Sequence, residues 1–148
     1  MKVLVINGPN LNMLGKREKD YYGTLTLDEI NKNLKKEAQK LKIDLSFFQS
    51  NLEGEIVSAI HKACEDNIDG IIINAGAYTH TSIAIRDALI IFNKPFVEVH
   101  LSNVFSRENF RHSSMLSDIA LGVICGFKEN SYYLALHAIS KHLNKTKA

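Results

Sequence analysis

Apolar runs and amphipathic segments alternate along the whole chain. Short runs rich in Ile, Val, Leu and Phe, each bounded by polar or turn residues, predict strands over residues 2–7, 43–48, 70–75, 96–101 and 119–125. The third run, "GIIINA", is apolar at successive positions, which is typical of a strand buried on both faces. The runs therefore predict a central sheet.

The segments between these strands have the spacing of helices. Thr26 and Glu29 form a capping box, and apolar residues follow at helical intervals, namely Leu27, Ile30, Leu34, Ala38 and Leu41. Further helices are predicted over residues 54–67, from Thr81 or Ser82 to residue 93, and over residues 131–143, with a frayed tail at 144–148. This alternation predicts an α/β fold: a flavodoxin-like, doubly wound, five-stranded parallel sheet of order 2-1-3-4-5, in a single domain of residues 1–148.

Composition narrows the class of protein. The 148 residues are 45% hydrophobic and 23% charged, as expected for an ordinary globular domain. The net charge of +2 is too small to predict nucleic-acid binding, but it is compatible with a small anionic ligand. We expect neither a signal peptide nor a membrane span, because no apolar run is long enough. Cys64 and Cys125 lie in apolar patterns without metal-site spacing, which favours reduced, buried thiols in a cytoplasmic protein.

Polar side chains follow several strands at the point where each strand ends. In a doubly wound sheet, ligands bind beyond the carboxyl ends of the strands, where the strand order reverses. The polar residues expected on this rim are Asn7, Asn10, Asn74, His80, Glu98, His100, Ser102, Asn103, Arg107 and Arg111. Their recurrence at several strand ends predicts a binding site between the first and third strands.

Glu98 and His100 are two residues apart in a strand, so they share one face of the sheet. A buried carboxylate is costly unless it is paired, and a carboxylate beside an imidazole holds its tautomer and favours a proton donor. We expect the pair to be catalytic. The alternative is that Glu98 faces an edge or a subunit contact and that His100 is structural.

The loop over residues 8–23 is longer than an ordinary connection between a strand and a helix. It contains Arg17 and Tyr22, and a guanidinium beside a phenol stabilises the phenolate, which lets tyrosine act as a base. Its glycines would let the loop close over a ligand as a lid. The alternative is that Tyr21 and Tyr22 only cover the edge of the core.

Sequence patterns of several cofactor enzymes are missing. The chain has no G-x-G-x-x-G or Walker pattern, no G-x-S-x-G nucleophile turn and no zinc-ligand spacing. The residues at the rim therefore favour proton-transfer chemistry without a cofactor or a metal.

Six segments follow one another over nearly the whole chain and carry a resemblance to one known family. They are "INGPNLNMLGKRE", "YYGTLTLDEI", "FFQSNLEGEIVSAIH", "DGIIINAGAYTHTSIAIRDAL", "PFVEVHLSNVFSRENFRHSS" and "ALGVICGF". Together they resemble the type II 3-dehydroquinate dehydratases. The resemblance implies a lyase that converts 3-dehydroquinate to 3-dehydroshikimate and water in the shikimate pathway, by anti elimination through an enolate without metal or cofactor. It also implies a homododecamer, a tetramer of trimers.

The resemblance further implies roles for individual residues. Tyr22 matches the base that removes a proton next to the ketone, and Arg17 matches its activator. His100 matches the acid that protonates the leaving hydroxyl, with Glu98 as its partner. The other matches are Asn10, beside a water near the enolate oxygen; Asn74 and the backbone amides of Leu101 and Ser102, at the substrate carboxylate; His80 and Arg111, at the ring hydroxyls; and Asp87, which reaches the site of a neighbouring subunit.

Three alternatives fit the same residues. The chain could be a flavodoxin-like binding or signalling module without catalysis. It could also be a different lyase or isomerase that acts on a related hydroxy acid. Within the proposed site, Tyr21 is a rival for the base, although the adjacent Gly23 favours Tyr22.

Overall fold

The computed structural model describes residues 1–146 and is built around one parallel sheet. The strands run in the order β2-β1-β3-β4-β5, which confirms the predicted flavodoxin-like α/β class and topology. Their bounds are β1 (Lys2–Asn7), β2 (Asp44–Gln49), β3 (Gly70–Asn74), β4 (Phe96–His100) and β5 (Gly122–Cys125). The order reverses between β1 and β3, which pair from Val3 opposite Gly70 to Asn7 opposite Asn74.

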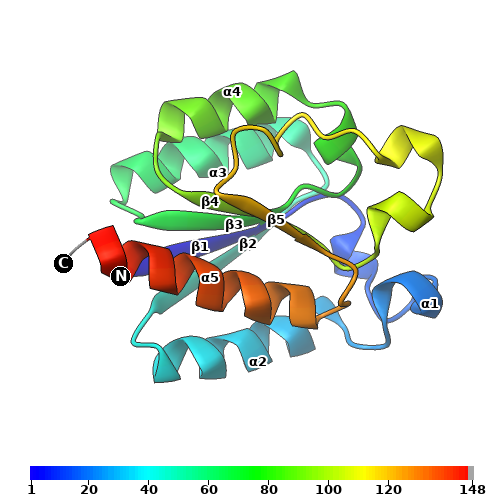
Figure 1. Ribbon diagram of the computed structural model, residues 1–148, viewed down its shortest axis with the longest axis horizontal. Helices are drawn as coiled ribbons and strands as arrows, with labels where there is room; N and C mark the ends of the chain where they lie inside the picture. Colours follow the sequence, from blue (N-terminus) through cyan, green and yellow to red (C-terminus); the bar gives the residue numbers. More distant parts are fainter. Residues whose placement is uncertain (147–148) are drawn as a thin grey trace.

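Helices cover both faces of the sheet (Figure 1). The helices α3 (Glu53–Glu65) and α4 (Ile83–Phe92) lie on one face, and α2 (Leu27–Lys40) and α5 (Asn130–Thr146) lie on the other. The buried apolar residues accordingly form two clusters, one under each pair of helices. Ile72 belongs to the α2–α5 cluster, whereas Ile71 and Ile73 belong to the α3–α4 cluster. The strand β3 is therefore buried on both faces, as its continuous apolar run predicted.

Side-chain caps fix where two of the helices begin. At α2 the Thr26 hydroxyl accepts a hydrogen bond from the Glu29 amide at 3.2 Å, and the Glu29 carboxylate accepts one from the Thr26 amide at 2.7 Å. This is the predicted capping box. At α4 the cap is Ser82, whose hydroxyl accepts from the Ile85 amide at 2.9 Å, so of the two predicted starting residues the helix uses the second.

Two predicted bounds are wrong by three residues, while the other predicted bounds agree with the structure to within two residues. The strand β5 begins at Gly122 instead of residue 119, because the Ile119 amide closes a turn onto the Leu116 carbonyl at 3.1 Å. The helix α5 continues to Thr146, three residues beyond its predicted end at residue 143. The Thr146 hydroxyl donates to the Leu143 carbonyl at 3.0 Å, which extends the last turn. The remainder of the predicted tail, residues 147–148, lies outside the described residues.

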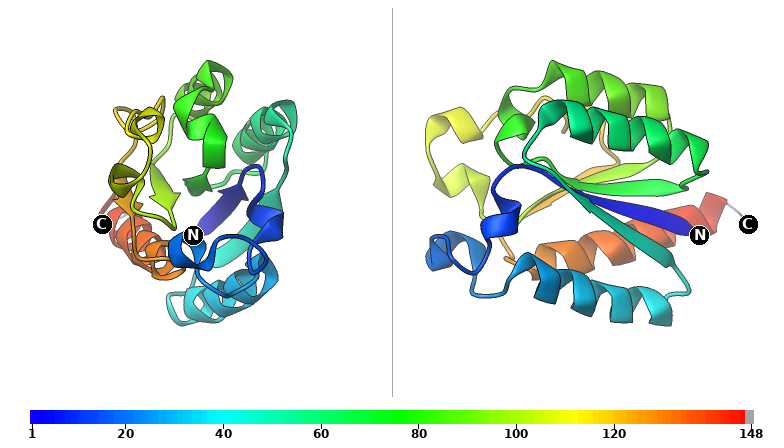
Figure 2. Two further views of the ribbon diagram at one scale, coloured as in Figure 1. Left: turned by 90° about the vertical axis from the view of Figure 1, so that its right-hand side faces the viewer. Right: turned by 180° about the vertical axis from the view of Figure 1, so that it is seen from behind.

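The loop of residues 8–23 is folded into two short helical segments, η1 (Leu11–Met13) and α1 (Lys19–Tyr22). They lie at the carboxyl end of the sheet, the same end as η3 (Val104–Ser106) and η4 (Asn109–Arg111), as Figures 1 and 2 show. Gly8 lets the loop pass close to the end of β3, because a Cβ at this position would lie 2.5 Å from the Ala75 carbonyl oxygen. This close approach brings the first loop beside Asn74.

Candidate active site

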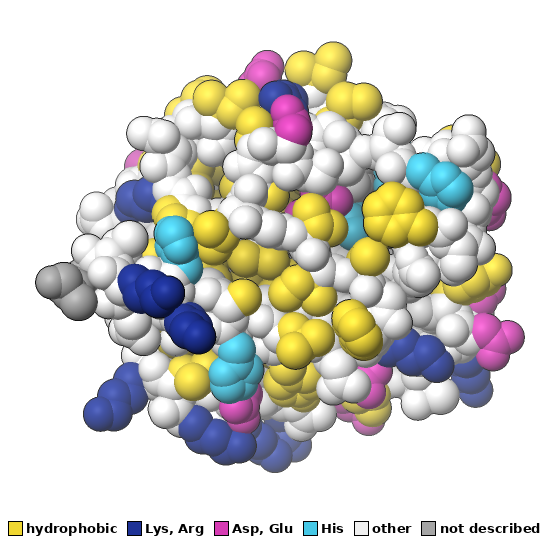
Figure 3. All heavy atoms as spheres, viewed as in Figure 1, with side chains coloured by type: hydrophobic (Ala, Val, Ile, Leu, Met, Phe, Trp, Pro, Cys, Tyr) yellow, Lys and Arg dark blue, Asp and Glu magenta, His cyan; other side chains and the backbone are white. Residues whose placement is uncertain are grey.

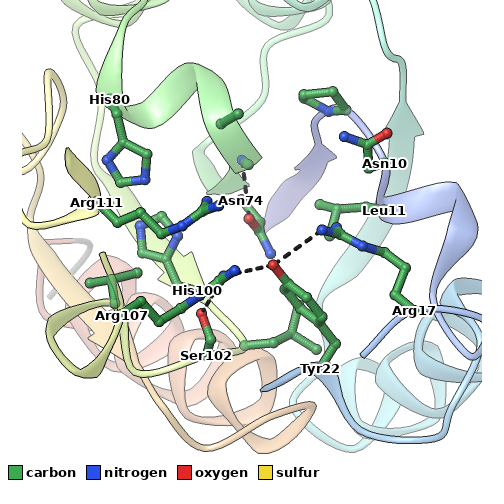
Figure 4. A pocket seen from close by; sticks show the side chains of 15 residues that line it. Asn10, Leu11, Arg17, Tyr22, Asn74, His80, His100, Ser102, Arg107 and Arg111 are labelled. Carbon is green, nitrogen blue, oxygen red and sulfur yellow. Dashed lines mark hydrogen bonds between the residues drawn. The ribbon is translucent and has the colours of Figure 1, made fainter. Parts of the chain in front are cut away.

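A pocket lies at the carboxyl end of the sheet, where the strand order reverses (Figure 4). Its walls come from the first loop, from the ends of β3 and β4 and from the segment after β4. The predicted site residues that line it are Asn10, Arg17, Tyr22, Asn74, His80, His100, Leu101, Ser102 and Arg111. The structure thus gathers residues from distant parts of the chain at the place that the topology predicted.

Tyr22, the last residue of α1, is only 8% exposed, and its hydroxyl reaches into the pocket (Figure 4). Two guanidinium groups donate to this oxygen, Arg107 through Nη1 at 2.6 Å and Arg17 through Nη2 at 3.2 Å. Because a guanidinium can only donate, the oxygen accepts both hydrogen bonds, and both donors are positively charged. The arrangement is suited to a tyrosine that acts as a base.

Arg107 lines the same pocket, but the sequence interpretation gave it no role beyond membership of the polar rim. Its side chain is 8% exposed, and its guanidinium lies 4.5 Å from the centre of the Tyr21 ring and 3.4 Å from the Ser102 hydroxyl. It is 85 residues from Tyr22 in the chain. No spacing rule connects two residues that far apart, so only its place in the rim cluster could have pointed to it.

Glu98 and His100 are in direct contact behind the pocket wall. His100 Nε2 lies 2.7 Å from Glu98 Oε1, and the two side chains are only 7% and 2% exposed. Since a carboxylate can only accept, Nε2 carries the shared hydrogen, and Nδ1 is left for a ligand. The other carboxylate oxygen, Oε2, accepts from the Ser114 hydroxyl at 2.9 Å. The imidazole is therefore held in one orientation.

His80 is held by a backbone contact. Its Nδ1 lies 2.7 Å from the Ser113 carbonyl oxygen, which can only accept, so Nδ1 carries the hydrogen and Nε2 is available for a ligand. The rings of His80 and His100 are stacked, with their centroids 6.3 Å apart. Two imidazoles of fixed orientation therefore stand side by side in one wall.

Asn74 is oriented by a buried hydrogen-bond chain. Its Oδ1 accepts from the Gly76 amide at 3.2 Å, and its Nδ2 donates to the Tyr132 hydroxyl at 3.0 Å. The Tyr132 hydroxyl in turn donates to Asn7 Oδ1. Burial raises the pKa of the Tyr132 phenol, so this link stays neutral. The second hydrogen of Asn74 Nδ2 remains for a ligand. Tyr132 is 58 residues from Asn74, and the sequence interpretation did not find it.

The rim of the pocket is held by further polar contacts. Asn10 has a left-handed backbone, with φ of 68°, and its backbone N–H donates to Asn51 Oδ1 at 2.9 Å. Arg111 Nε donates to Glu108 Oε2 at 2.5 Å, and this hydrogen bond lowers the pKa of the Glu108 carboxyl. Glu108 therefore stays ionised and steadies the Arg111 side chain.

Asp87 is not part of the pocket of its own chain. It is exposed on α4 and is absent from the residues that line the pocket.

Within residues 1–146 no cluster of three or more His, Cys, Asp or Glu side chains could hold a metal ion. No helix in this range has the length and apolar character needed to cross a membrane. Cys64 and Cys125 are unpaired and half-buried, so the thiols are less buried than an apolar pattern suggests.

The chain is similar to known proteins of one family. Residues 1–140 match the family described as Dehydroquinase class II. The chain is 57% identical over 145 residues to the 3-dehydroquinate dehydratase of Prochlorococcus marinus (strain NATL1A), a match that covers 98% of this chain and 99% of that protein. It is 59% identical over 140 residues to the 3-dehydroquinate dehydratase of Acinetobacter baylyi, with 94% of each covered. The crystal structure of type II dehydroquinase from Butyrivibrio crossotus superposes with a TM-score of 0.91 at 43% identity, over 97% of both chains.

Proposed function

This chain belongs to the class II dehydroquinase family, and from this premise we infer that it is a type II 3-dehydroquinate dehydratase of the shikimate pathway. The reaction removes water from 3-dehydroquinate and leaves 3-dehydroshikimate. A binding or signalling module without catalysis finds no support among these relatives. The observation that carries the mechanism is the Tyr22 oxygen, which lines the same pocket as His100 and accepts hydrogen bonds from two guanidinium groups.

We propose that Tyr22, as its phenolate, removes the proton from the carbon next to the substrate ketone. The electron pair of that C–H bond forms an enolate, and Tyr22 becomes neutral. Arg17 and Arg107 support this step because their charge stabilises the phenolate before the transfer. Asn10 lies at the rim of the same pocket, where we propose that it positions a water near the enolate oxygen.

The second half of the reaction is expulsion of hydroxide, a poor leaving group that needs an acid. We propose that His100 donates its proton to this oxygen, so that water leaves as the enolate collapses to the conjugated enone. Glu98 stabilises the imidazolium through its 2.7 Å contact with Nε2. One proton is taken and one is given, and no net oxidation occurs, so the residues of the pocket suffice without a redox cofactor or a metal.

The substrate is expected to be held by the polar wall of the pocket. We assign its carboxylate to Asn74 and to the backbone amides of Leu101 and Ser102, and its ring hydroxyls to His80 and Arg111. The free Nε2 of His80 can accept from a hydroxyl, and the free hydrogen of Asn74 can donate to a carboxylate. The loop of residues 8–23 would then act as a lid, because it carries both Arg17 and Tyr22 into the pocket.

The direct test is addition of 3-dehydroquinate to the purified protein while the ultraviolet absorbance of the conjugated enone is followed. We expect turnover that persists after treatment with a metal chelator. Sodium borohydride added together with substrate should leave the activity intact, since the proposed route forms no imine. Absence of enone formation would refute the function, and inactivation by borohydride would indicate a lysine imine instead.

We further propose that the chain assembles into a homododecamer, a tetramer of trimers, in the cytoplasm. Support for assembly comes from α4, where Asp87 shares its exposed face with Ile83, Ile90 and Ile91, whose side chains are 63%, 51% and 64% exposed. A second apolar area lies over β5 and α5 (Figure 3), where Val123 is 42% exposed.

If the exposed face of α4 packs against a neighbouring subunit, Asp87 on that face would reach the pocket of that subunit. Twelve chains of 16.6 kDa give a mass of about 200 kDa, which analytical ultracentrifugation measures. A monomer at micromolar concentration would contradict the assembly. The unpaired cysteines support the cytoplasmic location.

A further inference from the structure

The hydroxyl of Ser114 has a direction that its neighbours determine. Its oxygen accepts from two backbone amides, Leu116 at 3.0 Å and Ser117 at 3.1 Å. With both of these contacts made to the oxygen, its single hydrogen points to Glu98 Oε2, 2.9 Å away. Ser114 therefore acts as a donor to the carboxylate that holds His100.

The segment that carries Ser114 is anchored from two other elements. The Met115 amide donates to the Thr79 carbonyl at 2.8 Å, and Arg86 of α4 donates to the Met115 carbonyl at 2.8 Å. Arg86 also binds Asp118 through Nη2 at 2.9 Å. These contacts hold the Ser114 hydroxyl in place against Glu98, which is 2% exposed and has little access to water.

We propose that Ser114 is a positioning residue that strengthens His100 as the proton donor, an inference that rests on the proposed dehydration. When His100 gives up its proton, the charge of Glu98 is left without the imidazolium that had balanced it. The Ser114 hydroxyl stabilises this carboxylate by a charge-assisted hydrogen bond, so its contribution grows as the proton leaves. It acts through Glu98 and does not touch the substrate.

Other ionisable groups also face the Glu98–His100 pair. His80 stacks on His100, Cys125 pairs with His100 across β4 and β5, and further charged or ionisable groups line the pocket, namely Arg17, Tyr22, Arg107 and Arg111. A substitution at Ser114 leaves all of these in place. A change in the pH profile on removal of the hydroxyl therefore reports on the Ser114–Glu98 contact.

The test compares Ser114→Ala with the wild-type enzyme in the 3-dehydroquinate assay across pH. Only the part of this hydrogen bond that grows as the proton leaves lowers the barrier, so we expect kcat to fall about 2-fold to 10-fold, while KM changes little because Ser114 lies outside the substrate contacts. Without the hydroxyl the pair holds its proton more tightly, so the alkaline limb of kcat should move to higher pH. Ser114→Thr keeps a hydroxyl at this position and should retain most of kcat.

Ser114→Asp distinguishes the proposed role from a purely structural one, in which Ser114 only accepts from the Leu116 and Ser117 amides. Its side chain can still accept from the two backbone amides, but it places a second carboxyl group beside Glu98, and repulsion between the two replaces the neutral hydroxyl donor. We expect Ser114→Asp to be slower than Ser114→Ala, with both rates measured well below the unfolding midpoint of each variant. Recovery of kcat in the Asp variant would show that only the turn matters and would overturn the proposal.

The matched control is Ser117→Ala, which removes an exposed hydroxyl one turn away while its backbone amide still holds Ser114. It should show the wild-type kcat and pH profile. A wild-type kcat in Ser114→Ala, or a loss without any shift of the alkaline limb, would also refute the inference. Loss of all turnover in the wild-type enzyme would instead refute the proposed function, so the two failures are distinguishable.

Discussion

Replacement of Arg107 by methionine tests how the base is activated. Arg107 Nη1 lies 2.6 Å from the Tyr22 oxygen, whereas Arg17 Nη2 lies 3.2 Å away, so Arg107 makes the shorter of the two contacts. The side chain is 8% exposed, and its Nε is buried without a hydrogen-bond partner among the described residues. Methionine fills a similar space without charge, so we expect Arg107→Met to fold normally.

The expected loss follows from the lost hydrogen bond. A hydrogen bond to a charged group contributes about 1.5–3 kcal/mol, and each 1.36 kcal/mol in a barrier corresponds to about tenfold in rate. We therefore expect kcat to fall about 10-fold to 150-fold at saturating 3-dehydroquinate, with Arg17 still in place. Arg111→Met, by comparison, should act mainly on KM, because Arg111 is assigned to the substrate hydroxyls.

A double-mutant cycle shows whether Arg107 acts through Tyr22. If it does, Arg107→Met should have almost no further effect in a Tyr22→Phe background, because the oxygen that it stabilises has gone. The assay is the residual rate of enone formation in both single variants and in the double variant. Two losses that multiply in the double variant would refute the reasoning and would assign Arg107 an independent role.

Two further predictions concern stability. Tyr132→Phe removes the partner of Asn74 and Asn7 and should cost about 1–3 kcal/mol in urea unfolding at pH 7. Burial raises the pKa of Tyr132, so the stability of the wild type should fall above about pH 10. The difference in unfolding free energy between the wild type and Tyr132→Phe should therefore narrow above that pH. A difference that stays constant would contradict the assignment. The hydrogen bond from Arg86 lowers the pKa of the Asp118 carboxyl. The contribution of this ion pair to stability is therefore present above about pH 4 and is lost progressively as the pH falls below it. Asp118→Asn should accordingly unfold more easily than wild type at neutral pH, and the difference should shrink as the pH falls below about 4; equal midpoints at neutral pH would contradict it.

Sequence reasoning succeeded where the determining interactions are local. The apolar runs and the capping box at Thr26 depend on neighbouring residues, so the strands and the start of α2 could be predicted from them. The strand order was predicted from the usual topology of five alternating units. It failed at β5 because Ile119 is apolar but packs in the α3–α4 cluster beside a turn, ahead of the strand pairing. An apolar run alone does not show which of its buried residues pair with a neighbouring strand.

In the site, too, features that depend on local sequence were predicted, whereas contacts between distant residues were not. The ends of β1, β3 and β4 were placed by topology, and the Glu98–His100 contact followed from a spacing of two in one strand. The contacts of Arg107 with Tyr22 and of Tyr132 with Asn74 join residues 85 and 58 positions apart. Such contacts depend on how the first loop and α5 pack against the sheet, and no local pattern encodes that packing.

The most direct measurement is kcat for Tyr22→Phe beside its neighbour Tyr21→Phe, each with the wild-type unfolding midpoint verified. Both substitutions remove one hydroxyl and keep the ring, but only the Tyr22 oxygen lines the pocket and receives two guanidinium hydrogen bonds, while Tyr21 is 42% exposed. The account predicts a fall of about 10²-fold to 10⁴-fold for Tyr22→Phe and a rate close to wild type for Tyr21→Phe. A Tyr22→Phe enzyme that turns over normally, or an equal loss in both variants, would contradict it.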